Sequence, residues 1–108
     1  MGWFGFGGGS RTAPSITADE VEATAFVQTK FREGYDPEEV DAFLVRCVAS
    51  IRWIEGAPRP AEPVTAEQVV QQRFSQTKFR AGYDQDQVDD LLDRVTATLR
   101  AATDHPRP

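Results

Sequence analysis

The chain has 108 residues, of which 40% are hydrophobic and 27% charged, as in one small globular domain. Its net charge of −5 argues against a molecule built to bind nucleic acid, and it has no apolar run near the ~20 residues of a membrane span. Cys47 and His105 are its only cysteine and histidine and lie far apart, so we expect no disulfide, metal site, cofactor or enzymatic activity.

An internal repeat dominates the chain. Residues 16–51 and 64–99 align without a gap at an offset of 48, and 17 of the 36 aligned positions are identical. We therefore expect two copies of one structural unit. The expected segments are a flexible Gly-rich N-terminus (1–15), repeat 1 (16–52), a Pro-rich linker (53–63), repeat 2 (64–101) and a disordered tail (102–108).

The N-terminal segment combines many glycines with Trp3, Phe4 and Phe6. Such a composition favours a mobile chain. Its three aromatic rings also suggest a second membrane anchor, and both interpretations remain open.

Each repeat begins with the signals of a short helix. Thr17 and Glu20 have the spacing of a capping box, and Thr65 and Gln68 repeat it. We expect short helices over residues 18–26 and 66–74, each followed by a loop without an apolar period.

A longer helix is predicted after each loop. Asp36 is a suitable N-cap with Pro37 in the first turn, and Asp84 takes the N-cap position in the second copy. Gly34 and Gly82 come just before, where the chain must turn sharply, and glycine is the least costly residue there if φ is positive.

The long helices carry one apolar stripe each, with spacings of three and four residues. Neither stripe can be covered within its own unit, so the stripes must pack on each other or on another chain. The predicted fold is all-α: two helix–loop–helix repeats whose long helices pair as a short parallel coiled coil or small bundle. Cys47 matches Val95 of the second copy and is read as a small buried hydrophobe. The expected pairing residues are Val40, Phe43, Leu44, Cys47, Val48, Ile51, Val88, Leu91, Leu92, Val95 and Leu99.

One block, F-x-x-T-K-F-R-x-G-Y-D-x-x-x-V-D-x-(F/L)-L, occurs at residues 26–44 and again at 74–92. It resembles the N-terminal module of the DivIVA family of bacterial cell-pole and septum scaffolds. The resemblance implies a parallel dimer whose loops cross and whose tips insert phenylalanine into a membrane. Because this chain has two modules, one chain could hold both halves; pairing within a chain and pairing between chains both remain open.

The resemblance also implies which residues meet the membrane. Two phenylalanines would insert, two arginines would meet lipid phosphate, and two lysines would add charge: Phe31, Phe79, Arg32, Arg80, Lys30 and Lys78.

Ordinary structural roles compete with this assignment. Phe31 and Phe79 could plug each loop against the long helices as core residues. The two arginines could instead pair with carboxylates, since arginine–carboxylate pairs are common; the candidates are Asp36, Asp41, Asp84 and Asp89.

The expected function is a non-enzymatic DivIVA-type scaffold or adaptor in polar growth or cell division. It would be cytoplasmic and peripheral on the inner face of the cell membrane, with the poles or septum as its expected sites. Its partners would be an anionic membrane surface, bound weakly, and itself or other DivIVA-like coiled-coil proteins, with no nucleic acid or small-molecule substrate. The alternative is a soluble interaction module that pairs its apolar stripes with another coiled-coil protein and never touches membrane.

The two copies differ in charge. Residues 17–35 carry a net charge of −2 and residues 65–83 a net charge of +2. If the loops bind anionic lipid, we expect the second loop to dominate.

Overall fold

The computed structural model describes residues 14–104, with side chains described through residue 102. Its helices begin where the capping signals predict. The short helices α1 (Ala18–Ala23) and α3 (Ala66–Gln71) both have complete capping boxes, at Thr17 and Thr65. The long helices are α2 (Pro37–Ile54), with Asp36 as N-cap, and α4 (Gln85–Asp104). Both short helices end about three residues before the predicted positions.

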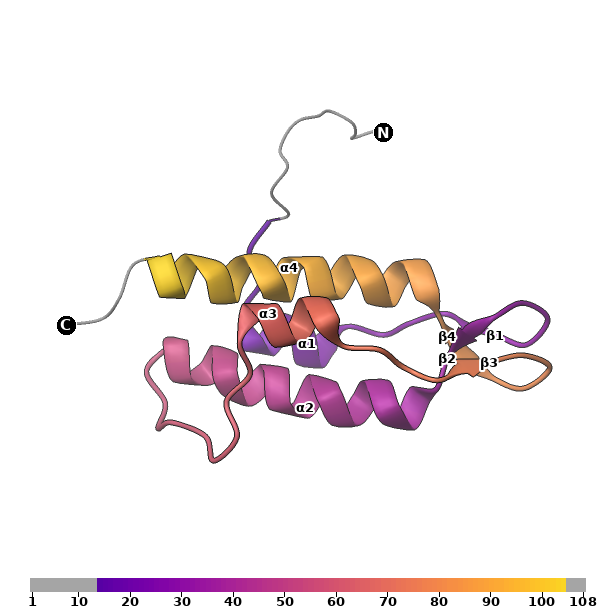
Figure 1. Cartoon of the computed structure of the whole chain (residues 1–108), viewed down its shortest axis with the longest axis horizontal. Helices are drawn as coiled ribbons and strands as arrows, with labels where there is room; N and C mark the ends of the chain where they lie inside the picture. Colours follow the sequence, from indigo (N-terminus) through magenta and orange to yellow (C-terminus); the bar gives the residue numbers. More distant parts are fainter. Residues whose placement is uncertain (1–13, 105–108) are drawn as a thin grey trace.

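The expectation of an all-α fold is wrong. The segments expected to be plain loops contain four short strands: β1 (Gln28–Thr29), β2 (Gly34–Tyr35), β3 (Gln76–Thr77) and β4 (Gly82–Asp84). Together they form a four-stranded antiparallel sheet beyond one end of the helices (Figure 1). The protein is therefore a mixed α/β structure and not a coiled coil or helical bundle. Strands of two or three residues are too short to show the alternation that identifies a strand in sequence.

The sheet interlocks the two repeats. Its strand order is β1-β4-β2-β3, so strands of the two repeats alternate across it. The central pair, β2 and β4, aligns Tyr35 with Tyr83, and the outer pairs join β1 to β4 and β2 to β3. Every strand pairing thus connects one repeat to the other, and neither repeat could form this sheet by itself.

Side-chain contacts around the sheet obey the same twofold relation. The Tyr35 hydroxyl donates to Asp89 at 2.9 Å, and the Tyr83 hydroxyl donates to Asp41 at the same distance. The ring of Phe26 lies 5.0 Å from that of Tyr83, and the Phe74 and Tyr35 rings are 5.3 Å apart. These residues match at the 48-residue offset of the repeat. The chain therefore folds as a pseudo-dimer of its own two halves.

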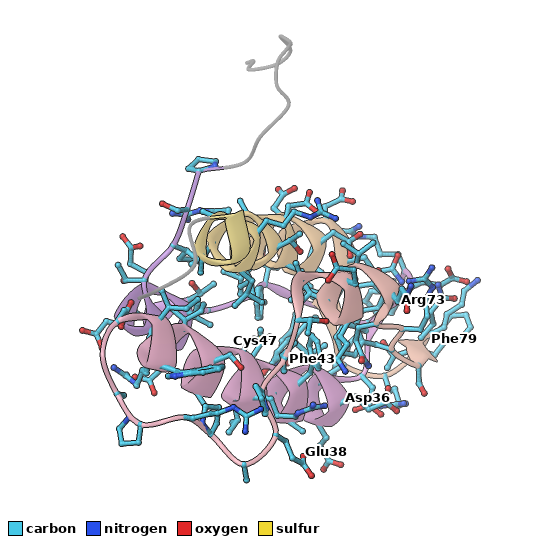
Figure 2. The ribbon with its side chains drawn as sticks, turned by 60° about the vertical axis from the view of Figure 1, so that its left-hand side comes forward. Asp36, Glu38, Phe43, Cys47, Arg73 and Phe79 are labelled. Atoms are coloured by element: carbon cyan, nitrogen blue, oxygen red, sulfur yellow. The ribbon has the colours of Figure 1, made fainter. Side chains whose placement is uncertain are left out.

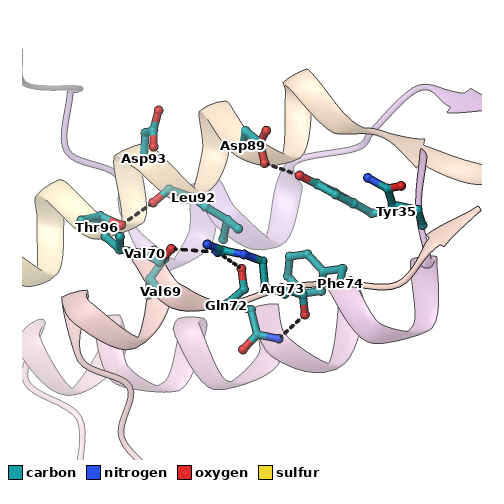
Figure 3. A pocket seen from close by; sticks show the side chains of 11 residues that line it. Tyr35, Val69, Val70, Gln72, Arg73, Phe74, Asp89, Leu92, Asp93 and Thr96 are labelled. Carbon is teal, nitrogen blue, oxygen red and sulfur yellow. Dashed lines mark hydrogen bonds between the residues drawn. The ribbon is translucent and has the colours of Figure 1, made fainter. Parts of the chain in front are cut away.

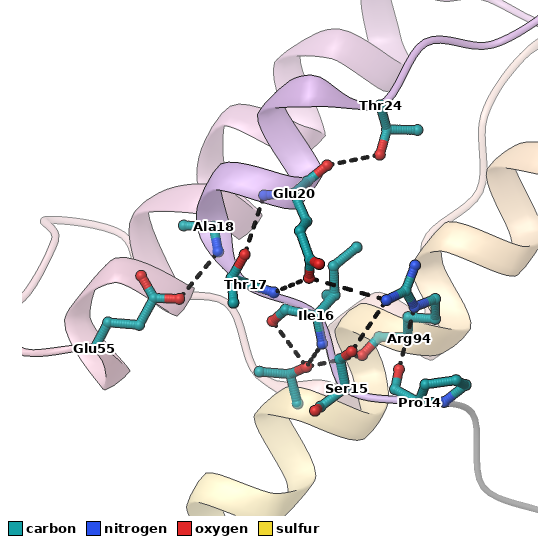
Figure 4. Close-up of polar contacts among 10 residues, drawn as sticks. Pro14, Ser15, Ile16, Thr17, Ala18, Glu20, Thr24, Glu55 and Arg94 are labelled. Carbon is teal, nitrogen blue, oxygen red and sulfur yellow. Dashed lines mark hydrogen bonds and ion pairs between the residues drawn. The ribbon is translucent and has the colours of Figure 1, made fainter.

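The opposite end of the molecule is tied together in the same way. The backbone N–H of Ile16 donates to the hydroxyl of Thr98, and that of Val64 donates to Ser50, both at 2.8 Å. Each repeat thus starts on the long helix of the other. Figure 4 shows the first of these contacts beside Arg94, whose guanidinium donates to the carbonyls of residues 14 and 15.

The core lies between the helices. Each short helix packs on the long helix of its own repeat, and both long helices leave the sheet in the same direction (Figure 1). Sixteen hydrophobic side chains form one buried cluster that draws equally on the two repeats. The most enclosed residues include Val40, Val88, Val95 and Cys47, each fully buried.

Gly34 and Gly82 serve close packing, and neither has a positive φ. Among described glycines only Gly56 has a positive φ, of 116°. A Cβ at Gly34 would come within 2.8 Å of the Tyr83 carbonyl oxygen, across the central strand pair. A Cβ at Gly82 would meet the Thr77 side chain and, at 3.2 Å, the carbonyl oxygen of Tyr35. Glycine is needed at position 34 because the backbone of the other repeat approaches so closely, and at position 82 mainly because Thr77 of the same repeat does.

Candidate functional site

The two K-F-R segments form the tips of the loops between β1 and β2 and between β3 and β4, which project together from the end of the molecule (Figure 1). The side chain of Phe31 is 85% exposed and that of Phe79 is 76% exposed. The interpretation of these phenylalanines as core plugs is therefore wrong. Figure 2 shows Phe79 at the outer end, far from Phe43 and Cys47 in the interior.

The two tips lie side by side. The backbone N–H of Phe79 donates to the carbonyl oxygen of Lys30 at 2.8 Å, which joins one loop directly to the other. Phe79 has a φ of 66°, the only positive value among described non-glycine residues. The ammonium group of Lys78 lies 5.6 Å from the centre of the Phe79 ring. The tips thus make one exposed surface that combines aromatic rings with cationic groups.

The tip arginines have carboxylate partners in the opposite repeat. Arg32 pairs with Asp84, and Arg80 lies 3.8 Å from Asp36. Both aspartates sit at the start of a long helix, and the Asp84 side chain is only 10% exposed. The alternative weighed from sequence, an arginine–carboxylate pair, is thus what the structure contains, with two of the four candidate aspartates.

These ion pairs divide the cationic groups of the tips into two kinds. Arg32 and Arg80 are still 65% and 58% exposed, but part of their charge is compensated by aspartate. Among residues 14–104, no described ion pair involves Lys30 or Lys78. The lysines are therefore the cations best placed to meet an external anion.

The eleven residues expected to pair helices lie in or against the core of a single chain. Ten are buried, and Leu44 is partly buried and packs against them. The stripes of the two repeats thus cover each other within the chain. Pairing them with another protein would require the core to open.

Two equivalent grooves lie along the helices. One, of about 510 Å³, runs between α3 and α4 (Figure 3), and the other, of about 530 Å³, runs between α1 and α2. All eleven lining positions of one groove match those of the other at the 48-residue offset. The tyrosine of the opposite repeat lines each groove, Tyr35 in the first and Tyr83 in the second, and its hydroxyl is bonded there to an aspartate. Sequence reasoning missed these grooves because each is built from both repeats.

The titratable groups of the grooves show the effect of this packing. Burial and the hydrogen bond to Asp89 raise the pKa of Tyr35 to about 12. Burial and the bond to Asp41 likewise raise the pKa of Tyr83. Both hydroxyls therefore stay protonated and act as hydrogen-bond donors across the repeat boundary at neutral pH.

Cys47 is buried among apolar side chains, as predicted, and burial raises the pKa of its thiol to about 12. A thiol in this environment is a packing group and not a nucleophile. Over residues 14–104 there is no group of three or more histidine, cysteine or acidic side chains that could hold a metal ion.

No helix in the described part of the chain is long and apolar enough to cross a membrane. The suggested aromatic anchor at Trp3, Phe4 and Phe6 lies outside the described residues, as do residues 105–108 of the expected tail. No family model, no curated protein and no solved structure matches this chain.

Proposed function

We propose that this chain is a non-enzymatic scaffold or adaptor of the DivIVA type, which binds an anionic membrane surface weakly through its paired loop tips. One observation carries the proposal: two phenylalanines, 85% and 76% exposed, stand side by side at the end of the molecule with lysines beside them. A ring exposed at a loop tip contributes nothing to the core. It is well placed to enter the interfacial region of a bilayer.

The ion pairs at the tips support a division of roles within the proposed membrane-binding surface. Phe31 and Phe79 are the inserting residues. Lys30 and Lys78 meet lipid phosphate, while Arg32 and Arg80 mainly hold each tip to the aspartate of the other repeat. The second tip carries a net charge of +2 from Lys78 and Arg80, whereas Glu33 reduces the first tip to +1. We therefore expect the second tip to contribute more.

The expected affinity is low. Burying one phenylalanine contributes roughly 1.5–3 kcal/mol, and one basic residue near an anionic surface adds about 1 kcal/mol. Two tips together give about 5–8 kcal/mol before ordering costs, which corresponds to micromolar binding at best. Lasting residence on a membrane would require several copies to act together.

Co-sedimentation with vesicles of anionic phospholipid tests the proposal. A Phe31→Ala, Phe79→Ala double variant is expected to lose nearly all binding, and Phe79→Ala alone should lose more than Phe31→Ala. Val70→Ala is the matched control, because Val70 is 53% exposed but lies on α3, away from the tips. Binding of the double variant at the level of the parent chain would refute the proposal.

Placement at a cell pole or division septum is the finer part of the proposal. It rests on the resemblance of the repeated motif to DivIVA modules. A fluorescent fusion is expected to mark poles or septa in a rod-shaped bacterium and to become diffuse when both tip phenylalanines are replaced. A fusion that stays at these sites without the two rings would show that another feature localises the protein.

A further inference from the structure

The two grooves are lined by equivalent positions of the two repeats, but the residues at some of these positions differ. Val45 on α2 lies in the α1–α2 groove and is 69% exposed, whereas the equivalent residue in the α3–α4 groove is Asp93. Ala25 likewise corresponds to Arg73. The fold accepts a charged residue at both places, so it does not itself require an apolar surface in the α1–α2 groove.

The α1–α2 groove combines an apolar floor with acidic edges. Leu44, Val45 and Val48 supply aliphatic surface from α2. Glu22 and Asp41 line the same groove and are its only charged lining residues. Asp41 accepts a hydrogen bond from the hydroxyl of Tyr83. Glu22 shares the guanidinium of Arg52 with Asp19, so the edge of the groove keeps an excess of negative charge.

The α3–α4 groove is a poorer apolar site. Figure 3 shows the guanidinium of Arg73 lying in it, where it donates to the carbonyl oxygens of Val70 and Gln72. Asp93 replaces the exposed valine, and its pKa is raised by burial and by its neighbours Asp90 and Asp89. A cationic ligand would meet like charge from Arg73 here.

The β3–β4 loop tip of the second repeat has the apolar and cationic groups that would suit the apolar floor and acidic edges of the α1–α2 groove. Phe79 supplies one exposed ring, and Lys78 and Arg80 flank it without an acidic residue in the loop. The first tip is less suitable because it contains Glu33. The two repeats have thus diverged: each groove is lined by two carboxylates, but only the α3–α4 groove also holds an arginine, and only the first tip contains a glutamate.

We propose that the β3–β4 tip of one copy docks into the α1–α2 groove of a second copy. Phe79 contacts the exposed Val45, and Lys78 approaches Glu22 and Asp41. The loop tips project away from the helices (Figure 1), so a chain cannot place its tip in its own groove. Contacts between a tip and a groove are heterologous, and copies therefore add head to tail. This inference does not depend on lipid binding by the tips.

Sedimentation velocity without lipid, over a wide range of protein concentration, measures the association. Phe79→Ala and Val45→Asp are each expected to weaken it at least tenfold. Val45→Asp reproduces the residue that α4 carries at the same place, so the fold should tolerate it; circular dichroism verifies this. Phe31→Ala and Asp93→Val are the matched controls and should leave association within about twofold of the parent chain. Added salt should weaken it.

Mixing the two defective variants decides the geometry. Phe79→Ala retains an intact groove and Val45→Asp an intact tip, so an equimolar mixture is expected to form dimers that neither variant forms alone. A symmetric contact, tip to tip or α2 to α2, would not be rescued in this way. The proposal is overturned if the parent chain stays monomeric up to millimolar concentration, if either variant associates like the parent, or if the mixture shows no rescue.

Discussion

A methyl group at Gly34 tests how closely the two halves of the chain interlock. The added Cβ would lie 2.8 Å from the Tyr83 carbonyl oxygen and 3.0 Å from the carbonyl carbon of Gly82. Both atoms belong to the backbone of β4 and cannot rotate away. Relief requires β2 and β4 to separate by roughly half an ångström, which weakens contact across the sheet.

The expected cost is that of overpacking, about 1–3 kcal/mol. For a domain of this size, each kcal/mol lowers Tm by about 4–8 °C. Thermal and urea unfolding of Gly34→Ala, followed by far-ultraviolet circular dichroism, should therefore show a loss well outside error.

Gly34→Asn separates crowding from backbone conformation. If Gly34 were needed for a positive φ, asparagine would be tolerated better than alanine, because asparagine enters the left-handed region more easily. Crowding predicts the reverse order, since asparagine is larger. Parent-like stability of Gly34→Ala, or an asparagine variant more stable than the alanine variant, would refute the close-packing account.

Three further predictions follow from the same contacts. Cys47 should react with a thiol reagent at pH 8 only as fast as the chain unfolds, and prompt reaction in the native state would show that the thiol is accessible. The folded pKa of Tyr35, about 12, exceeds the ordinary value of 10.0, so its contribution to stability is complete below pH 10 and declines as pH rises from there toward 12. The free energy of unfolding of Tyr35→Phe should therefore fall less steeply with pH, between pH 9.5 and 11, than that of the parent chain. Phe79→Gly relieves a left-handed φ worth roughly 1–2 kcal/mol and should be more stable than Phe31→Gly, which relieves none; equal stabilities would contradict this.

Local signals in the sequence predicted the helices well. A cap acts within about four residues, so Thr17, Thr65 and Asp36 could be recognised without knowledge of the rest of the fold. The apolar stripes were equally clear, because helical periodicity is also local. Both were found in the structure at their predicted positions.

The sheet could not be predicted in the same way. Gln28 pairs with Tyr83 and Tyr35 with Gln76, across 55 and 41 residues respectively. Nothing within either short segment indicates such a partner. The packing role of the glycines was missed for the same reason: a sharp turn is a local property, whereas contact of Gly34 with the backbone of the other repeat is not.

The candidate site was predicted in part. The resemblance to a known module directed attention to Phe31 and Phe79, and the structure exposes both. The sequence offered four aspartates as candidate partners of Arg32 and Arg80 and could not choose among them. The actual partners, Asp84 and Asp36, each reach the tip from the opposite repeat, which no local pattern indicates. The sequence of either repeat alone contains no pattern that indicates the grooves, because each groove is built from both repeats.

The strand order also determines when the first repeat can acquire its structure during synthesis. Because β4 lies between β1 and β2, residues 28–35 have no sheet partners until residues 76–84 have been made. At about 5–20 residues per second, the 48-residue offset between the repeats corresponds to a delay of roughly 2–10 s. Throughout that interval the apolar stripe of α2 lacks its cover from α4. The nascent chain should therefore depend on the ribosome surface or a chaperone for protection just before its second half emerges.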